Sequence, residues 1–191
     1  YYFGKDYILM SKFVLIDGHS ILNRAFYGVP IFTNSEGLHT NAVFGFLNIM
    51  FKIIDSKQPD YMAVAFDVHQ PTFRHEMFKD YKGTRKPMME ELREQVPVIK
   101  ELLQKMNITT VELPGYEADD VIGTLSKKGE KAGMEVDVIS GDRDLLQLAS
   151  DHITICIPKT KKGQTTVEEY NTEGVRRLYK VTPTEFIDVK A

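Results

Sequence analysis

The sequence predicts an α/β fold in which helices flank a mostly parallel central sheet. Three short apolar runs are rich in β-branched and aromatic residues, and each is followed by an acidic residue, which is typical of buried parallel strands; they lie at 13–16, 62–66 and 136–139. Between them lie segments with apolar residues at helical spacing, such as 92–106. Alternating strands and helices of these lengths indicate a sheet with helices on both faces.

The first half of the chain supplies two strands and three helices. Ser20 is a candidate cap for a short helix, and Pro59 ends a long apolar helix that begins at Thr40 or Asn41. Proline, asparagine and glycine between these helices indicate a loop. The elements expected here are a strand at 13–16, a helix at 21–27, a loop at 28–40, a helix from 40 or 41 to 58, a strand at 62–66 and a helix at 89–106.

The second half continues the alternation. Gly133 ends a helix that starts in an acidic segment, and Gly163 lies in the tip of a basic hairpin. Thr182 and Glu185 form a capping box that opens a last helix. The elements expected here are a strand at 108–113, a helix at 117–132, a strand at 136–139, a helix through 145–148, a strand at 153–157 and a hairpin tip at 159–166.

Length and composition are those of a soluble globular protein. The 191 residues carry a formal net charge of −3 and allow one large domain or two small ones. The single cysteine, Cys156, cannot form an internal disulfide, which fits a reducing, cytoplasmic compartment. No apolar stretch approaches the roughly 20 residues of a membrane span, so no membrane partner is expected. Residues 1–11 are interpreted as a leader of unknown origin, and 12–191 as the domain.

Acidic residues gather where the predicted strands end. Two follow the first two strands, three crowd the start of the helix at 117–132, and two follow the strand at 136–139. Ligands of open α/β sheets bind in the crevice outside the carboxyl ends of the strands. We therefore expect seven carboxylates at one rim: Asp17, Asp67, Glu117, Asp119, Asp120, Asp142 and Asp144.

Such a cluster requires positive charge, because two like charges about 4 Å apart repel by roughly 4 kcal/mol at an effective dielectric of about 20. Nearby lysines and arginines are too few to supply it, and oxygen-only ligands favour hard cations, so the sequence predicts two Mg²⁺ (or Mn²⁺) ions. Each acid also has a structural interpretation. Asp17 can form a turn, the acids at 117–120 suit a helix dipole, and Asp142 or Asp144 can cap a helix.

A second informative segment, 70–87, mixes cations with aromatic residues. Its five cations outnumber its two acids, although the whole chain is acidic. Cations bind phosphates, and aromatic faces stack on unpaired bases at about 1–3 kcal/mol each. We expect a mobile lid that contacts nucleic acid; the alternative is a solvated amphipathic helix. The residues assigned to these contacts are Arg74, Phe78, Lys79, Tyr81, Lys82, Arg85 and Lys86.

Other chemistries lack their signatures in this sequence. A Ser/His/Asp elbow, a metal-binding histidine pair, the GxGxxG pattern and the Walker pattern are absent. A receiver-like phosphoacceptor also has an acidic Mg²⁺ pocket, but it does not account for the basic segment or for so many acids. An acidic metal pocket beside a basic segment suits hydrolysis of a phosphodiester, whose oxygens two hard cations can accept.

Seven motifs occur in a fixed order along the chain: LIDGHS at 15–20, NRAF at 23–26, AFD at 65–67, FRHE at 73–76, YKGTR at 81–85, PGYEADD at 114–120 and GDRD at 141–144. Together they resemble the 5′-nuclease domain of bacterial DNA polymerase I, a member of the flap-endonuclease superfamily. The resemblance covers residues 12–191. It implies a PIN-like core, a helical arch through which a 5′ single strand passes, and removal of 5′ flaps and RNA primers in DNA replication and repair.

The resemblance also implies roles for individual residues. The seven acids match the metal-binding positions of the family, and Tyr81 matches a position where a stacking aromatic helps to unpair the substrate. Arg74, Lys82 and Arg85 match phosphate-steering cations, and Arg24, in the second motif, is assigned to DNA binding. The family continues with a further aspartate pair and a helix-hairpin module that grips duplex DNA. Because the chain ends at Ala191, we interpret it as truncated before that module. The resemblance also implies a polymerase domain as a partner in the same parent chain.

The resulting hypothesis is a monomeric, divalent-metal-dependent 5′ nuclease acting on branched or gapped DNA. In it Lys82, Arg85 and Asp119 are catalytic. Lys82 and Arg85 neutralise charge that develops on the scissile phosphate, and Asp119 is a metal ligand. The first metal is held by Asp17, Asp67, Glu117 and Asp119, and the second draws on Asp142 and Asp144. Two alternatives remain open: a PIN-type ribonuclease, and a DNA-binding fragment that is inactive because metal ligands are missing.

Overall fold

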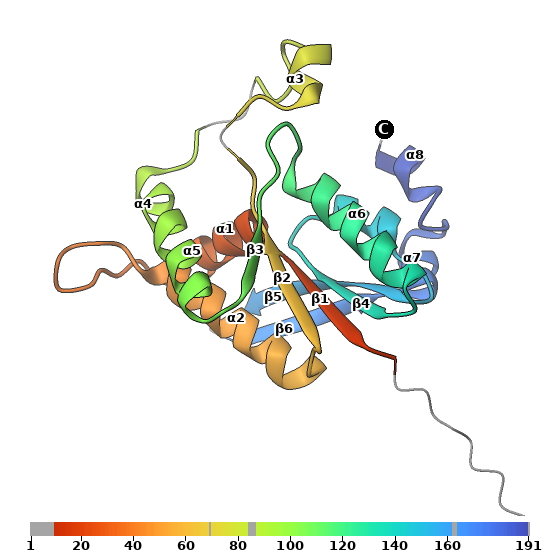
Figure 1. The fold of residues 1–191 in the computed structure, drawn as a ribbon, viewed down its shortest axis with the longest axis horizontal. Helices are drawn as coiled ribbons and strands as arrows, with labels where there is room; N and C mark the ends of the chain where they lie inside the picture. The colour runs from red at the N-terminus through yellow and green to blue at the C-terminus, as the bar shows by residue number, and fades with distance from the viewer. Residues whose placement is uncertain (1–9, 69, 84–86, 162–163, 191) are drawn as a thin grey trace, which may run out of the picture.

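A computed structural model describes residues 10–68, 70–83, 87–161 and 164–190 (Figure 1). Its centre is a six-stranded sheet with the order β3-β2-β1-β4-β5-β6, in which every neighbouring pair is parallel except β5 and β6. The predicted mostly parallel sheet is therefore confirmed. The strands are β1 (Lys12–Asp17), β2 (Tyr61–Ala65), β3 (Thr109–Val111), β4 (Glu135–Ile139), β5 (Ile153–Lys161) and β6 (Gln164–Tyr170).

Helices cover both faces of the sheet, as the alternation predicts. One face carries α1 (Gly18–Gly28), α2 (Asn41–Lys57), α4 (Glu90–Arg93) and α5 (Gln95–Lys105). The other face carries α6 (Ala118–Lys131), the 3₁₀ helix η1 (Arg143–Leu148), α7 (Thr172–Tyr179) and α8 (Phe186–Lys190). The short helix α3 (Phe73–Met77) projects from the body at the top of Figure 1.

Each helical layer packs on alternate residues of the central strands. In β1, Val14 and Ile16 are buried against the α2 layer, whereas Leu15 is buried against the α6 layer. This period of two is what a strand buried on both sides requires. Cys156, in β5, is a free thiol buried in the α2 layer. None of the helices in the described ranges combines the length and the apolar composition that a membrane crossing requires.

Several element boundaries differ from the predictions for identifiable reasons. Helix α1 begins at Gly18 rather than at residue 21, because Asp17 and not Ser20 caps it by accepting the Ser20 N–H at 3.0 Å. The helix predicted at 89–106 is divided at Glu94. Pro97 has no N–H to donate to the carbonyl four residues earlier and its ring crowds that carbonyl, which explains the break.

The last third of the chain shows two further differences. The helix predicted through 145–148 is the 3₁₀ helix η1, and residues 164–170, of which only 164–166 were expected as part of a hairpin tip, form the antiparallel edge strand β6. Gly163, at the predicted tip, lies outside the described residues. The capping box at Thr182 is present: its backbone N–H donates to Glu185 at 2.8 Å, and its hydroxyl accepts the Glu185 N–H at 3.2 Å.

Gly18 is expected to tolerate no side chain, whereas Gly123 is expected to accept one. A Cβ on Gly18 would lie 2.4 Å from Cε1 of the buried Phe66, so Gly18→Ala should lower the free energy of unfolding by about 1–3 kcal/mol. In α6, a Cβ on Gly123 would meet nothing closer than 3.6 Å, so Gly123→Ala should raise it by roughly 0.5–1 kcal/mol. Urea unfolding of both variants measures the two opposite signs. A Gly18→Ala variant as stable as the wild type would contradict the packing of Phe66 against α1.

Candidate active site

The parallel register brings the predicted acids to one edge of the sheet. Asp17 ends β1 opposite Ala65 of β2, and Ile16 pairs with Ile139 of β4, so the three strands finish side by side. Asp67 follows β2, Glu117 caps α6 and Asp142 caps η1, each just beyond that edge. The convergence results from strand register, because segments distant in the sequence end at the same height in the sheet.

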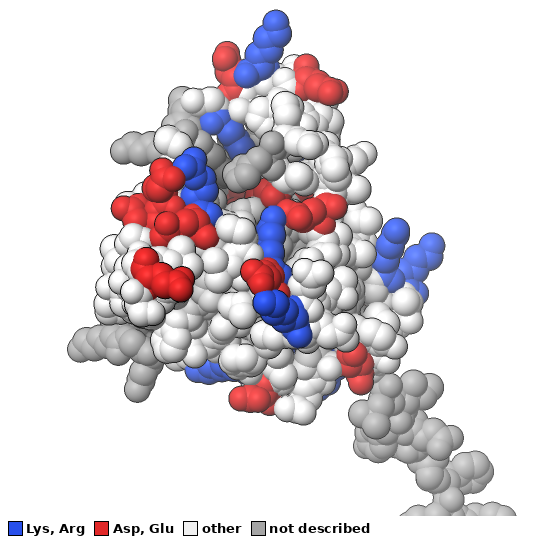
Figure 2. All heavy atoms as spheres, turned by 60° about the vertical axis from the view of Figure 1, so that its left-hand side comes forward, with Lys and Arg blue, Asp and Glu red and all other residues white. Residues whose placement is uncertain are grey.

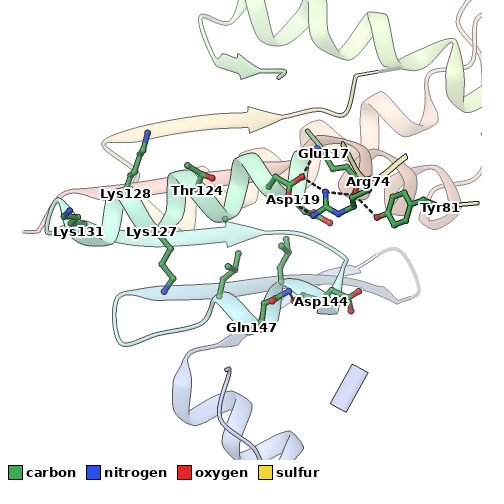
Figure 3. A pocket seen from close by; sticks show the side chains of 14 residues that line it. Arg74, Tyr81, Glu117, Asp119, Thr124, Lys127, Lys128, Lys131, Asp144 and Gln147 are labelled. Atoms are coloured by element: carbon green, nitrogen blue, oxygen red, sulfur yellow. Dashed lines mark hydrogen bonds and ion pairs between the residues drawn. The ribbon is translucent and has the colours of Figure 1, made fainter. Parts of the chain in front are cut away.

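Two adjoining pockets contain all seven acids. The first, which we call the acid pocket, has a volume of about 980 Å³ and is lined by five of them: Asp17, Asp67, Glu117, Asp119 and Asp142. The second, of about 790 Å³, is lined by Asp120 and Asp144 and shares Glu117 and Asp119 with the first (Figure 3). The arrangement brings five of the carboxylates together in one hollow and places the other two beside it.

Asp17 is the most deeply buried of these acids. Its side chain accepts hydrogen bonds from the Ser20 N–H at 3.0 Å and from the Ser140 hydroxyl at 2.8 Å. The pKa of Asp17 is raised to about 6, chiefly by burial and also by the negative charges of Asp67 and Asp142, while the two hydrogen bonds oppose the rise. A carboxylate kept in such a position favours a bound cation.

Asp119, in the first turn of α6, has the same character. The pKa of Asp119 is raised to about 7, chiefly by burial and also by the nearby charges of Asp17, Asp142 and Asp67, while Lys82 opposes the rise. Asp17 and Asp119 therefore repel one another, and neither forms an ion pair within the described part of the chain. This agrees with the charge argument made from the sequence.

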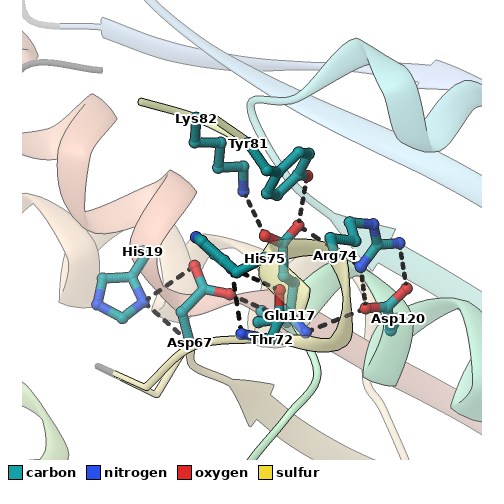
Figure 4. A network of polar contacts seen from close by, with 10 residues as sticks. His19, Asp67, Thr72, Arg74, His75, Tyr81, Lys82, Glu117 and Asp120 are labelled. Atoms are coloured by element: carbon teal, nitrogen blue, oxygen red, sulfur yellow. Dashed lines mark hydrogen bonds and ion pairs between the residues drawn. The ribbon is translucent and has the colours of Figure 1, made fainter. Parts of the chain in front are cut away.

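For Glu117 and Asp120 the sequence prediction of too few neighbouring cations is wrong. Arg74 forms a bidentate ion pair with Asp120, with both N–O distances 2.7 Å, and Lys82 Nζ lies 2.7 Å from Glu117 Oε1 (Figure 4). The Tyr81 hydroxyl also donates to Glu117 at 3.2 Å. The Arg74 hydrogen bonds lower the pKa of the Asp120 carboxyl. The basic segment therefore supplies the missing cations for the outer acids.

Asp67 is oriented by two neighbours. Its Oδ1 accepts the Ala118 N–H at 2.7 Å, which ties the end of β2 to the start of α6. The backbone N–H of Asp67 donates to His19 Nδ1 at 3.1 Å, and the His19 ring stands edge-on to Phe66. His19 is therefore a partly buried positioning residue, which the fold places beside the end of β2.

The loop after β4 is held to α1 by two serines. The Ser140 hydroxyl, which donates to Asp17, accepts the Asp142 N–H at 3.0 Å. Ser20 Oγ accepts the Gly141 N–H at 2.9 Å, so Ser20 links α1 to this loop and does not cap a helix. Sequence reasoning missed Ser140; the signal available was its place directly after an apolar strand and before GDRD.

Asp142 and Asp144 differ in environment. Asp142 caps η1 by accepting the Asp144 N–H at 2.9 Å, so the structural interpretation is right for Asp142, which nevertheless also lines the first pocket. Asp144 is exposed in the wall of the second pocket. The capping hydrogen bond occupies one carboxylate oxygen of Asp142, and the other oxygen takes no part in the cap.

The predicted DNA-binding residues fall into three groups. Arg74, Tyr81, Lys82 and Arg24 line the pockets. Phe78 and Lys79 are exposed and line neither pocket, and Arg85 and Lys86 lie outside the described residues. Arg24 Nε is buried and has no hydrogen-bond partner among the described residues, which leaves a cationic donor at the wall of the first pocket. Acidic and basic side chains lie next to one another across the upper half of the face shown in Figure 2.

The chemistry of the donors fits a hard divalent cation. The acid pocket offers carboxylate oxygens, and no cysteine is among its described lining residues. The raised pKa values of Asp17 and Asp119 reflect burial and the negative charge of neighbouring carboxylates. Within the described ranges no three His, Cys, Asp or Glu side chains lie close enough to hold one ion together. The residues therefore fit in kind and charge, and ligation would require their side chains to approach one another.

Comparisons with known proteins agree with this geometry. The chain matches the family described as 5′-3′ exonuclease, N-terminal resolvase-like domain, over residues 12–180. It is 50% identical over 182 residues to a DNA polymerase I of Bacillus caldotenax and 51% identical over 180 residues to one of Bacillus subtilis. The matches cover 95% and 94% of this chain and 20% of each polymerase, so the chain spans about a fifth of the length of these relatives.

Solved structures show the same fold. A zinc-bound T5 5′-exonuclease superposes with a TM-score of 0.72 at 23% identity, covering 94% of this chain and 65% of that chain. The T5 D15 flap endonuclease, in a complex with DNA and metal ions, gives a TM-score of 0.70 at 23% identity, with the same coverage of 94% and 65%. The chain therefore belongs to the 5′-3′ exonuclease family, a family of nucleases, through its N-terminal resolvase-like domain.

Proposed function

We propose that the chain is a divalent-metal-dependent 5′ nuclease that hydrolyses phosphodiester bonds in DNA carrying a 5′ flap or an RNA primer. The observation that carries this proposal is the pocket in which buried, mutually repelling acids lie beside the cationic side chains of Arg24 and Lys82. Family membership supports hydrolysis of DNA, and the solved relatives that hold metal ions support the dependence on metal.

Six of the acids would hold the ions. Asp17, Asp67, Glu117 and Asp119 would provide the oxygens for one ion, and Asp142 and Asp144 would contribute to a second. Two Mg²⁺ or Mn²⁺ ions, when bound, supply Lewis acidity at a phosphodiester and stabilise charge on the leaving oxygen. Ser140 and His19 act through these acids: the first donates to Asp17, and the second accepts the backbone N–H of Asp67.

The cations and aromatic residues of the basic segment 70–87 would position the substrate. Lys82 and Arg74 are held at the pocket by Glu117 and Asp120, so an incoming phosphate meets donors that are already oriented. Tyr81 offers a ring at the pocket wall on which an unpaired base can stack. Arg24, whose Nε has no hydrogen-bond partner among the described residues, lies on the α1 side of the first pocket and can bind a neighbouring phosphate.

A labelled duplex with a 5′ flap tests the proposal directly. The chain should cleave it with Mg²⁺ or Mn²⁺, lose cleavage completely in EDTA and regain it when excess Mg²⁺ is returned. Binding without cleavage in either metal would favour an inactive DNA-binding fragment. Faster cleavage of a single-stranded RNA of equal length would favour the PIN-type ribonuclease.

A further inference from the structure

The second pocket extends well beyond the acids that the proposed function uses. It is a groove between α6 and η1, and one end of it is lined by Arg74, Tyr81 and the acids shared with the first pocket. The other end is lined by three lysines of α6: Lys127, Lys128 and Lys131. Figure 3 shows these lysines on the C-terminal half of α6, at the opposite end of the pocket from Tyr81.

The lysines form an exposed basic patch. Lys127 pairs with Glu130 at 3.1 Å, whereas Lys128 and Lys131 have no carboxylate partner within the described ranges. Cations near the C-terminus of a helix are favoured by its dipole, which accounts for basic residues in the last turns of α6. The dipole does not account for their opening onto a hollow that is continuous with the acid pocket.

The dimensions of the groove suit a short length of nucleic acid. From Asp119 to Lys131 the helix rises about 18 Å, at roughly 1.5 Å per residue. A stacked strand carries one phosphate per about 3.4 Å, so the lysines lie about three to five nucleotides from the acids. Leu148 of η1 packs against α6 at Gly123, where its Cδ2 lies 3.6 Å from the position of an added Cβ, so the two helices touch at this point. The volume of the groove, about 790 Å³, favours one strand over a duplex.

We propose that this groove holds the 5′ single strand of the substrate, with its phosphates on Lys127, Lys128 and Lys131. The proposal rests on the proposed function, because it takes the acid pocket as the place where the strand meets the duplex. A positively charged groove that follows the backbone, with an aromatic ring such as Tyr81 at its entrance, is the usual arrangement for binding single strands. The acids at the entrance repel the same strand, so the lysines provide a favourable position beyond them.

The test compares two duplexes that differ only in the length of the 5′ flap, about one and about ten nucleotides. Binding is measured by fluorescence anisotropy in EDTA, where no cleavage is expected. In the triple variant Lys127→Ala/Lys128→Ala/Lys131→Ala, Kd for the long flap should rise about tenfold at low salt. The slope of log Kd against log salt should decrease by about 2, because three single-strand phosphate contacts are lost. Kd for the short flap, which cannot reach the lysines, should not change.

A control variant of equal charge is Lys52→Ala/Lys105→Ala/Lys159→Ala, since all three lysines are outside both pockets. It should bind both duplexes as the wild type does. An equal loss for long and short flaps, or no loss for either, would overturn the groove proposal. Because the readout is binding, a chain that follows the predicted pattern without cleaving DNA would refute the proposed nuclease function and not the groove.

Discussion

The Asp119→Asn variant is expected to lose cleavage of a 5′-flap duplex by about a thousandfold, while the metal-free protein becomes more stable at neutral pH. Asp119 lies where burial and three neighbouring carboxylates oppose its ionisation. Asparagine keeps the shape and removes the charge, so it removes the repulsion together with a metal-binding oxygen. A metal ligand should lower the stability of the metal-free protein, because its charge is then not compensated, and should be required for activity.

The pH dependence of this effect has a definite sign. The pKa of Asp119 is about 7 in the folded chain, compared with an ordinary value of 3.8. Between these values the folded state binds more protons than the unfolded state, so wild-type stability decreases as pH rises from about 4 to about 7. Asparagine does not titrate. The stability advantage of Asp119→Asn should therefore grow over that range and stay constant above it.

Urea unfolding in EDTA at pH 5 and pH 8 measures the stability effect, and flap cleavage in Mg²⁺ measures activity. Asp151→Asn is the matched control for activity, because Asp151 is exposed and lines neither pocket. It should cleave at the wild-type rate. Full activity in Asp119→Asn would remove this residue from the site, and a stability difference that shrinks between pH 5 and pH 8 would contradict the burial argument.

Hydrophobic periodicity was sufficient to predict the sheet and both helical layers, because each central strand is a short apolar run followed by an acid. Local signals also located the starts of α2 and α6 to within a residue. Other features depend on contacts distant in sequence. β6 is mostly polar and is a strand because β5 pairs with it, and the carboxylate of Asp17, not Ser20, caps α1.

For the site, the sequence indicated which residue types converge but not how they are paired. Parallel strand ends predict a common edge, and this alone grouped the seven acids. The Arg74–Asp120 pair joins residues 46 positions apart, and the Ser140–Asp17 bond joins residues 123 positions apart. No local pattern encodes such pairings, since they depend on how the projecting segment folds back and on how β1 and β4 are aligned.

Replacing Lys82 by glutamine is expected to lower kcat by about a hundredfold with little change in KM. Lys82 Nζ is 2.7 Å from Glu117, in the wall of the acid pocket, and opposes the rise in the pKa of Asp119. A cation at this position neutralises charge that grows on a phosphate during hydrolysis, and it stabilises the transition state more than the bound substrate. Glutamine keeps a side chain of similar length at a backbone position with φ of 58°, so the backbone strain is unchanged.

Lys79→Gln is the control within the same segment. Lys79 is exposed and lines neither pocket, so a contact from it to DNA can only assist binding. This variant should raise KM a few-fold at low salt and leave kcat unchanged, because a screened surface charge acts on encounter with the substrate. The two variants change net charge equally and lie three residues apart. If both variants raised KM equally and kept kcat, Lys82 would only attract DNA electrostatically. Other residues would then neutralise the charge on the reacting phosphate.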